Sequence, residues 1–226
     1  MIKLENTEVM GWEGAIRGMR NPMNSWEKSD SVLCMRRSDC HGCRFYTEKF
    51  TCSAPKTLKY AIGPNDHDLM MRLAKGGPVH AKYRRQIFVS VDITAPLYWW
   101  KEFDTYKVGT TANSCSTMHK IHAKEFARDD FSHEHLCDLS IQNLQDTIDV
   151  LNKCRTLYLE TKDKKYWWQM IQLLPTSYNQ MRTVTMTYEN LCNMYHYRKD
   201  HKLDEWHTFC DWIKELPYSE VITLEE

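Results

Sequence analysis

The alternation of apolar and polar positions along the chain predicts three β-strands. In each segment apolar residues alternate with residues that are mostly polar, a period typical of a strand with one face in the core. In the first segment the alternation is short: Ile2 and Leu4 alternate with Lys3 and Glu5. The segments lie near the start, in the middle and late in the chain: residues 1–9, 87–93 and 182–188. We therefore expect a small sheet whose strands are far apart in the sequence.

Apolar residues at helical spacing predict helices between and after these strands. Asn65 or Asp66 is the expected N-cap of the second helix, Pro96 is expected in the first turn of the third, and Ser140 is expected to cap the long fourth one. The predicted helices are 12–19, 65–75, 97–104, 140–158, 164–174, 189–200 and 203–216.

Several helices combined with few strands indicate an α+β fold. We expect one domain over residues 1–226, with a small, mostly antiparallel sheet packed with the helices. Residues from about 24 to 60 are polar and rich in serine and cysteine, without clear periodicity. This stretch is predicted to be an insertion into the domain.

Composition and charge narrow the classes of partner. The chain has 226 residues, enough for a sizeable core, with 30 Lys plus Arg against 30 Asp plus Glu. With these charges in balance, the protein has no net positive charge that would attract it to nucleic acid or an anionic membrane. The longest apolar run, "APLYWW", is too short to span a bilayer, and the start lacks the pattern of a secretory signal. We expect a cytoplasmic protein with no membrane or nucleic-acid partner.

Four of the nine cysteines lie close together in the predicted insertion. They are Cys34, Cys40, Cys43 and Cys52. Four thiolates can complete a tetrahedral zinc site, and a structural zinc would order a segment that has little core of its own. Free thiols on a surface insertion are the alternative. A redox-active pair is less favoured, because the Cys-x-x-Cys does not open a helix after a strand.

A polar run of small residues, "YKVGTTANSCSTMH", directly follows the aromatic segment "APLYWWKEFDT". It spans residues 106–119 and contains one aliphatic residue, Val108. A surface loop has this composition, and so does the floor of a pocket that approaches a ligand closely. The local sequence leaves both interpretations open.

Three segments, in order, resemble the flavin-dependent thymidylate synthases. They are "EVMGWEGAIRGMR", "QIFVSVDITAPLYWWKEFDTYKVGTTANSCST" and "LLPTSYNQMRTVTMTYENLCNMYHYRKD". The resemblance covers about residues 1–22 and 62–214 and leaves the cysteine-rich segment outside as an insertion. It implies the family's α+β fold.

The middle segment resembles the family signature R-H-R-x-x-S-x-N-x-x-S-x-R with changes. Thr105, Tyr106 and Lys107 stand where the family has Arg-His-Arg, and Met118 stands in place of the final Arg. After an insertion of one residue, Asn113 and Ser116 match the family's Asn and second Ser. The resemblance implies that Tyr106 and Lys107 contact the cofactor and that Asn113 and Ser116 contact the substrate.

The late segment supplies the catalytic candidate. Arg198 matches the arginine that the family places against the pyrimidine ring, and Asn193 matches an asparagine on the helix that faces the flavin. Gln86 stands where members often carry a histidine, which implies a further cofactor contact. A guanidinium at the uracil edge stabilises charge that develops on the ring, so the resemblance implies both substrate binding and catalysis by Arg198.

The implied reaction transfers a one-carbon unit from methylenetetrahydrofolate to C5 of dUMP, with FAD reduced by NADPH. The resemblance also implies a homotetramer. Two alternatives stay open because the Arg-His-Arg stretch is altered. One is hydroxymethylation at C5 of a related pyrimidine nucleotide, and the other is a non-catalytic nucleotide-binding or scaffold protein on the same fold.

Overall fold

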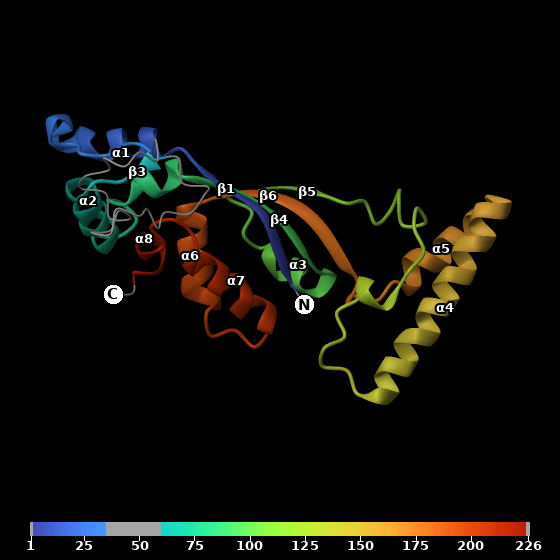
Figure 1. Cartoon of the computed structure of the whole chain (residues 1–226). Coiled ribbons are helices and arrows are strands. Elements are labelled where there is room, and N and C mark those ends of the chain that lie inside the picture. The colour runs from blue at the N-terminus through green and yellow to red at the C-terminus, as the bar shows by residue number, and fades with distance from the viewer. Residues whose placement is uncertain (1, 35–59, 225–226) are drawn as a thin grey trace. The chain divides into compact units, whose positions relative to one another are not determined.

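The computed structural model describes residues 2–34 and 60–224 (Figure 1). The chain divides into two compact units, each assembled from separate stretches of sequence. Unit 1 consists of Met1–Glu5, Asp92–Thr105 and Ala112–Thr183, and unit 2 consists of Asn6–Val91, Tyr106–Thr111 and Val184–Glu226. Helices and a small sheet make up the described chain, which confirms the predicted α+β class.

The sheet has four strands in the order β1-β4-β6-β5, namely β1 (Lys3–Met10), β4 (Phe88–Pro96), β6 (Asn179–Thr187) and β5 (Thr111–Ser114). The three predicted strands are confirmed as β1, β4 and β6. β5 was not predicted, because its sequence TANS contains no alternating apolar residue and all four residues are exposed. A separate antiparallel pair, β2 (Val32–Leu33) and β3 (Tyr60–Ala61), borders residues 35–59, which lie outside the described part.

The seven predicted helices are confirmed, with ends shifted by a few residues. Among the described residues, no helix is both long enough and apolar enough to cross a membrane. The α-helices are α1 (Trp12–Arg20), α2 (Pro64–Lys75), α3 (Leu97–Phe103), α4 (Asp138–Thr161), α5 (Lys164–Leu173), α6 (Tyr188–Arg198), α7 (Asp204–Lys214) and the unpredicted α8 (Glu220–Thr223). Short 3-10 helices are η1 (Asn21–Met23), η2 (Trp26–Lys28), η3 (Lys82–Gln86) and η4 (Arg128–Asp130).

The predicted N-caps were wrong for both helices. α2 begins at Pro64 after an extended Gly63, and its first N–H groups are capped from outside the helix: the Asp30 carboxylate accepts from the backbone N–H groups of Asn65 (2.9 Å) and Asp66 (3.1 Å). α4 begins at Asp138, two residues before Ser140.

The start of α3 also differs from its prediction. Pro96 is the last residue of β4 and the N-cap residue of α3, so it lies just before the helix and not in its first turn. Pro96 has an extended backbone, with φ −67° and ψ 150°. The helix therefore begins at Leu97.

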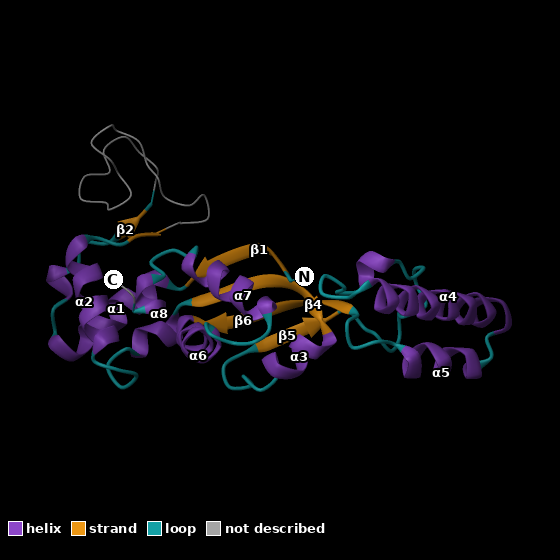
Figure 2. Cartoon of the chain, turned by 90° about the horizontal axis from the view of Figure 1, so that it is seen from below, coloured by secondary structure: helices purple, strands orange, loops and turns teal. Residues whose placement is uncertain are grey.

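In unit 1, α4 and α5 lie alongside each other and bury an apolar cluster (Figure 2). The predicted apolar face of the long helix is confirmed, because Leu144, Ile148 and Leu151 are all buried in it. Helix α5 contributes Met170. The remaining buried members come from the chain before α4: Ile121, Phe126 and Phe131.

The aromatic segment before the polar run forms a second core in unit 1. Trp99 and Trp100 are packing residues, with 0% and 1% of their surface exposed. The indole N–H of Trp100 donates to the Gln180 carbonyl at 2.9 Å, and the Arg182 guanidinium lies 4.1 Å from the Trp100 ring centroid. Arg182 also bonds to Asp104 at 2.8 Å. Helix α3 is thereby fixed to β6.

Unit 2 has an aromatic core around Trp12. Its ring packs edge-on against Tyr188 at 5.3 Å and Tyr218 at 5.2 Å between centroids. Both hydroxyls are bonded to backbone: Tyr188 donates to the Pro217 carbonyl at 2.6 Å, and Tyr218 accepts from the Ile62 N–H at 2.7 Å. α1, α6 and the C-terminal segment therefore share one core.

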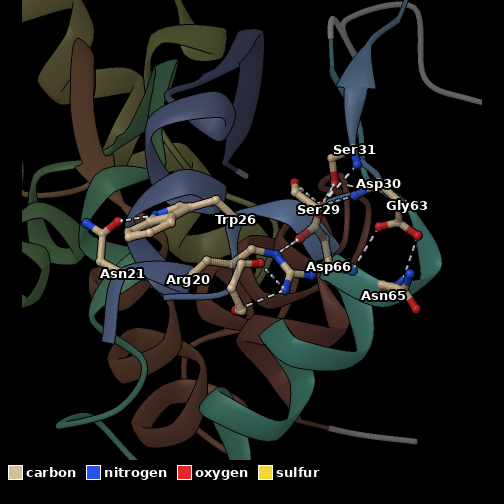
Figure 3. A network of polar contacts seen from close by, with 10 residues as sticks. Arg20, Asn21, Trp26, Ser29, Asp30, Ser31, Gly63, Asn65 and Asp66 are labelled. Atoms are coloured by element: carbon tan, nitrogen blue, oxygen red, sulfur yellow. Dashed lines mark hydrogen bonds and ion pairs between the residues drawn. The ribbon is translucent and has the colours of Figure 1, made fainter. Parts of the chain in front are cut away.

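A buried carboxylate organises the polar side of unit 2 (Figure 3). Asp66 is 0% exposed and pairs with the buried Arg20, whose Nε lies 2.5 Å from its Oδ1. Its Oδ2 accepts from the Ser29 hydroxyl (2.8 Å), the Asp30 N–H (3.1 Å) and both the N–H (3.0 Å) and hydroxyl (2.6 Å) of Ser31. One side chain thus joins α1, α2 and the chain before β2.

Replacing Asp66 by Asn should destabilise the protein by about 3–5 kcal/mol, because it leaves the buried Arg20 charge without its counterion. The measurement is the free energy of unfolding from urea titration. Asp68→Asn is the matched control, since the Asp68–Arg72 pair is 69% and 68% exposed and should contribute at most about 1 kcal/mol. Equal losses in the two variants would contradict the assigned role of Asp66.

The same carboxylate should make stability depend on pH in the acid range. Burial by itself raises the pKa of Asp66, but hydrogen bonds from Ser31, Ser29 and Arg20, with the charge of Arg20, outweigh it and hold the pKa below its ordinary value. A lowered folded-state pKa adds stability that is complete above the unfolded-state pKa of about 3.9 and is lost as pH falls through the folded-state pKa.

The difference in unfolding free energy between the wild type and Asp66→Asn should therefore be constant above about pH 5 and shrink below about pH 4. Urea titrations at a series of pH values measure it. A difference that stays the same down to the acid-unfolding region would show that the carboxylate charge is not the stabilising feature.

Candidate functional site

The polar run begins with a loop held against the start of α6 in unit 2. Gly109 has φ +78°, and a Cβ there would lie 3.0 Å from the Asn190 side-chain oxygen. The Asn190 amide donates to the Val108 carbonyl at 2.7 Å. This close approach of backbone to side chain explains why a glycine stands at this position.

Asn190 also caps α6, so one side chain serves both the loop and the helix. Its side-chain oxygen accepts from the Thr187 N–H (3.0 Å) and hydroxyl (2.7 Å), while the Asn190 N–H donates to the Thr187 hydroxyl (3.3 Å). This is a capping box, with asparagine in the place of the more usual glutamate. The Thr-x-x-Asn spacing was a signal for it, but sequence reasoning did not single out Asn190.

Arg198, the catalytic candidate, lies at the end of α6 between two aromatic rings. Its Nε donates to the Tyr106 hydroxyl at 2.9 Å. Its guanidinium carbon lies 4.9 Å from the Trp206 ring centroid and 5.5 Å from that of Tyr106. The Trp206 ring is fully buried and packs edge-on to Tyr106 at 6.1 Å. The guanidinium is thus oriented by one hydrogen bond and two ring faces, an arrangement that lysine could not adopt.

Two predicted site residues, Tyr106 and Arg198, are therefore in direct contact. Trp206, which lies within the predicted helix 203–216, completes the group. We call Tyr106, Arg198 and Trp206 the Arg198 clamp. No local pattern could have indicated the contact, because the three residues come from a loop and two different helices.

The other predicted cofactor residues of unit 2 have polar side chains at the surface. Lys107 and Asn193 are exposed. Gln86, at the end of η3, is also exposed, and its side-chain oxygen lies 2.8 Å from the position that a Cβ on Gly18 would take. Gln86 therefore lies against α1.

The two predicted substrate residues of unit 1 differ in environment. Asn113 is exposed on β5. Ser116 is half-buried, and its hydroxyl accepts from the backbone N–H groups of His119 (2.9 Å) and Met118 (3.3 Å). The chain before it is fixed to β6, since the Cys115 N–H donates to the Met181 carbonyl at 2.9 Å. Ser116 therefore shapes a rigid turn.

That turn borders a cavity of about 640 Å³ in unit 1. Hydroxyls of Ser116 and Thr117 line it together with the ammonium groups of Lys3, Lys120 and Lys124. Lys124 is paired with Asp130, which also lines the cavity. Hydroxyls and lysines are groups that bind phosphate oxygens. Thr117 and Lys120 were not singled out from the sequence, although both belong to the stretch that follows the matched Ser116.

Tyr178 adds a protonated hydroxyl to the lining of this cavity. Burial, together with the nearby charges of Asp130 and Cys115, raises the pKa of Tyr178 above its ordinary value. The group therefore stays neutral at physiological pH.

Of the predicted zinc ligands, only Cys34 belongs to the described residues, as a half-buried free thiol. Cys40, Cys43 and Cys52 lie outside the described residues. Within the described residues, no group of three or more His, Cys, Asp or Glu side chains could hold a metal ion. The zinc site therefore stays a prediction.

Comparison with known proteins gives matches at the level of structure. No protein-family model matches the sequence, and no curated protein matches it. Two crystal structures of thymidylate synthase X (ThyX) from Helicobacter pylori with FAD and dUMP are similar to this chain. One has a TM-score of 0.63 and 14% identity over 99% of this chain and 98% of that one. The other has a TM-score of 0.62 and 13% identity over 98% and 97%.

The likeness covers nearly the full length of both chains, and it confirms the predicted resemblance at the level of the fold. The described chain therefore has the fold of the flavin-dependent thymidylate synthase ThyX.

Proposed function

We propose that this protein is a divergent flavin-dependent thymidylate synthase, acting as one ThyX-like domain over residues 1–226. In the proposed reaction, C5 of dUMP acquires the one-carbon unit of methylenetetrahydrofolate, and FAD reduced by NADPH is the source of the hydride. The observation that carries the proposal is the Arg198 clamp, on a fold that ThyX bound to FAD and dUMP also has.

Arg198 is the residue we propose to bind and activate the pyrimidine. Its fixed guanidinium can donate to the carbonyl oxygens of the uracil edge and stabilise negative charge as C5 attacks. Because the hydrogen bond to Tyr106 and the contact with Trp206 already orient it, little side-chain freedom is lost on binding. Catalysis then requires no cysteine nucleophile.

The cavity of unit 1 supports a phosphate contact. The family's final signature arginine is Met118 here, yet Lys120 and the hydroxyls of Ser116 and Thr117 line the cavity next to it. We propose that these groups bind a nucleotide phosphate and that Asn113 contributes to substrate binding. Assembly into a homotetramer is part of the same proposal, because the resemblance implies active sites built at subunit junctions.

Tyr106, Lys107, Gln86 and Asn193 are the proposed FAD contacts. Their hydroxyl, ammonium and amide groups suit the phosphate and ring edges of a flavin nucleotide. Lys107 is exposed and keeps the only charge of the former Arg-His-Arg stretch. For Tyr106 the structure adds a second role, since its hydroxyl positions Arg198.

One observation favours a non-catalytic nucleotide-binding protein as the second candidate. Thr105, which replaces the first arginine of the signature, uses its hydroxyl to donate to the Glu102 carbonyl at 2.7 Å at the end of α3. A family position for ligand binding has thus become a structural one. Product analysis decides between this candidate, a thymidylate synthase and a C5 hydroxymethylase.

Replacing Arg198 by Ala should lower kcat/KM for dUMP by about 10²-fold or more, as expected when a donor to developing charge is lost. The assay follows product formation from dUMP, methylenetetrahydrofolate and NADPH with FAD-loaded protein. Lys202→Ala is the control, because it also removes one positive charge but lies on the exposed segment after α6. A purified protein that takes up no FAD, or equal activity in both variants, would refute the proposal.

The Tyr106→Phe variant tests whether the Tyr106 hydroxyl positions Arg198. It keeps the ring beside Trp206 and removes only the acceptor of the Arg198 Nε hydrogen bond. We expect a loss of about tenfold in kcat/KM, smaller than that of Arg198→Ala. Because the Tyr106 hydroxyl is also a proposed FAD contact, activity is compared per bound flavin. Unchanged activity per bound flavin would show that this hydroxyl does not position Arg198.

The cysteine cluster carries a separate proposal, a structural zinc ion held by Cys34, Cys40, Cys43 and Cys52. Protein purified without chelator should contain about one zinc per chain, the stoichiometry of a closed four-thiolate site. Elemental analysis measures it. Cys43→Ser should lose the metal, while Cys210→Ser, at a buried position in α7, should keep it. Zinc-free wild type would rule the site out.

A further inference from the structure

A second cavity of unit 1, of about 390 Å³, lies beyond the proposed substrate site along the chain. Three segments line it: the turn after Ser116, the end of α4 and the start of α5. We name it the α4–α5 cavity. Its lining residues are Met118, His119, His122, Tyr158, Lys162, Lys164 and Trp167.

The lining of this cavity carries two positive charges. Lys162 and Lys164 carry ammonium groups, and His119 and His122 carry imidazoles, while the described lining residues include no carboxylate. The acidic side chain between the two lysines, Asp163, instead accepts from the Lys165 N–H at 3.0 Å and pairs with its ammonium group at 3.1 Å. The lining therefore favours a ligand of negative charge.

Aromatic rings form the apolar part of the cavity. Tyr158 and Trp167 line it, and the two ammonium groups lie close to their faces: Lys162 at 6.0 Å from the Tyr158 centroid and Lys164 at 5.8 Å from that of Trp167. Aromatic faces beside positive charges can bind a flat heterocycle that bears phosphate, the ring by stacking and the phosphate by charge-assisted hydrogen bonds.

Hydrogen bonds to backbone fix the walls. The Trp167 indole N–H donates to the Met118 carbonyl at 3.0 Å, and Arg155 donates to the His122 carbonyl at 3.0 Å.

We propose that the α4–α5 cavity is a second ligand site, which binds a nucleotide-class molecule through Lys162 and Lys164 at its phosphates and Trp167 and Tyr158 at its ring. The volume is within the range of small-molecule sites, at its lower end, and suits a mononucleotide. The site is separate from the cavity of Ser116 and Lys120, with which it shares no lining residue.

The test is calorimetric titration with ADP, adenosine and inorganic pyrophosphate as probes, in the presence of saturating dUMP and FAD. ADP should bind more tightly than either fragment, because only ADP carries both ring and phosphates. Lys162→Ala/Lys164→Ala should weaken ADP binding by at least about tenfold, since bonds to charged groups are the stronger class. Lys101→Ala/Lys153→Ala removes two exposed lysines elsewhere in unit 1 and should leave it unchanged.

If both double variants weakened ADP binding equally, the loss would be an effect of net charge, and the proposed site would be refuted. The proposal would also be refuted if dUMP and ADP competed and Lys162→Ala/Lys164→Ala weakened the binding of both. The cavity would then belong to the substrate site. Absence of ADP binding to the wild type would likewise refute the proposal. None of these outcomes requires thymidylate synthase activity, so this proposal and the proposed function can fail independently.

Discussion

The junction between β6 and α6 is the constraint on which the candidate active site depends. Thr187 ends the strand and caps the helix, and Asn190 returns the hydrogen bond and also holds the Val108 carbonyl. This single asparagine therefore sets where α6 begins and where the loop that carries Tyr106 lies. Arg198 lies two turns later on the same helix. It contacts Tyr106 because the junction fixes both the helix that carries Arg198 and the loop that carries Tyr106.

The sequence alone predicted most of the regular structure, since the signals for it are local. Two patterns indicated which face of an element is buried: the alternation around Val89 and the helical spacing of Leu144, Ile148 and Leu151. The structure buries these residues. Strand β5 was not predicted because its sequence has no apolar face. It forms a strand because it pairs with β6. Its position is set by neighbours in space and not by its own residues.

The candidate site could be predicted only in part, for the same physical reason. The family resemblance indicated Tyr106 and Arg198 separately, but their hydrogen bond joins residues 92 positions apart, and the Trp206 ring reaches the guanidinium from another helix. Asp30 is a comparable case. It caps α2 from more than thirty residues upstream, so a search for a cap at the helix itself selects Asn65 or Asp66 and fails.

The contacts of Asp66 have a consequence for how this chain can vary in length. Ser31 and Gly63 are thirty-two positions apart, yet the Gly63 N–H donates to the Ser31 hydroxyl at 3.0 Å, and Asp66 holds the same serine from the other side. β2 and β3 pair directly beyond them. Every partner in these contacts is a described residue outside the segment between β2 and β3. The contacts that join the start of α2 to the chain after α1 therefore do not depend on the number of residues between β2 and β3.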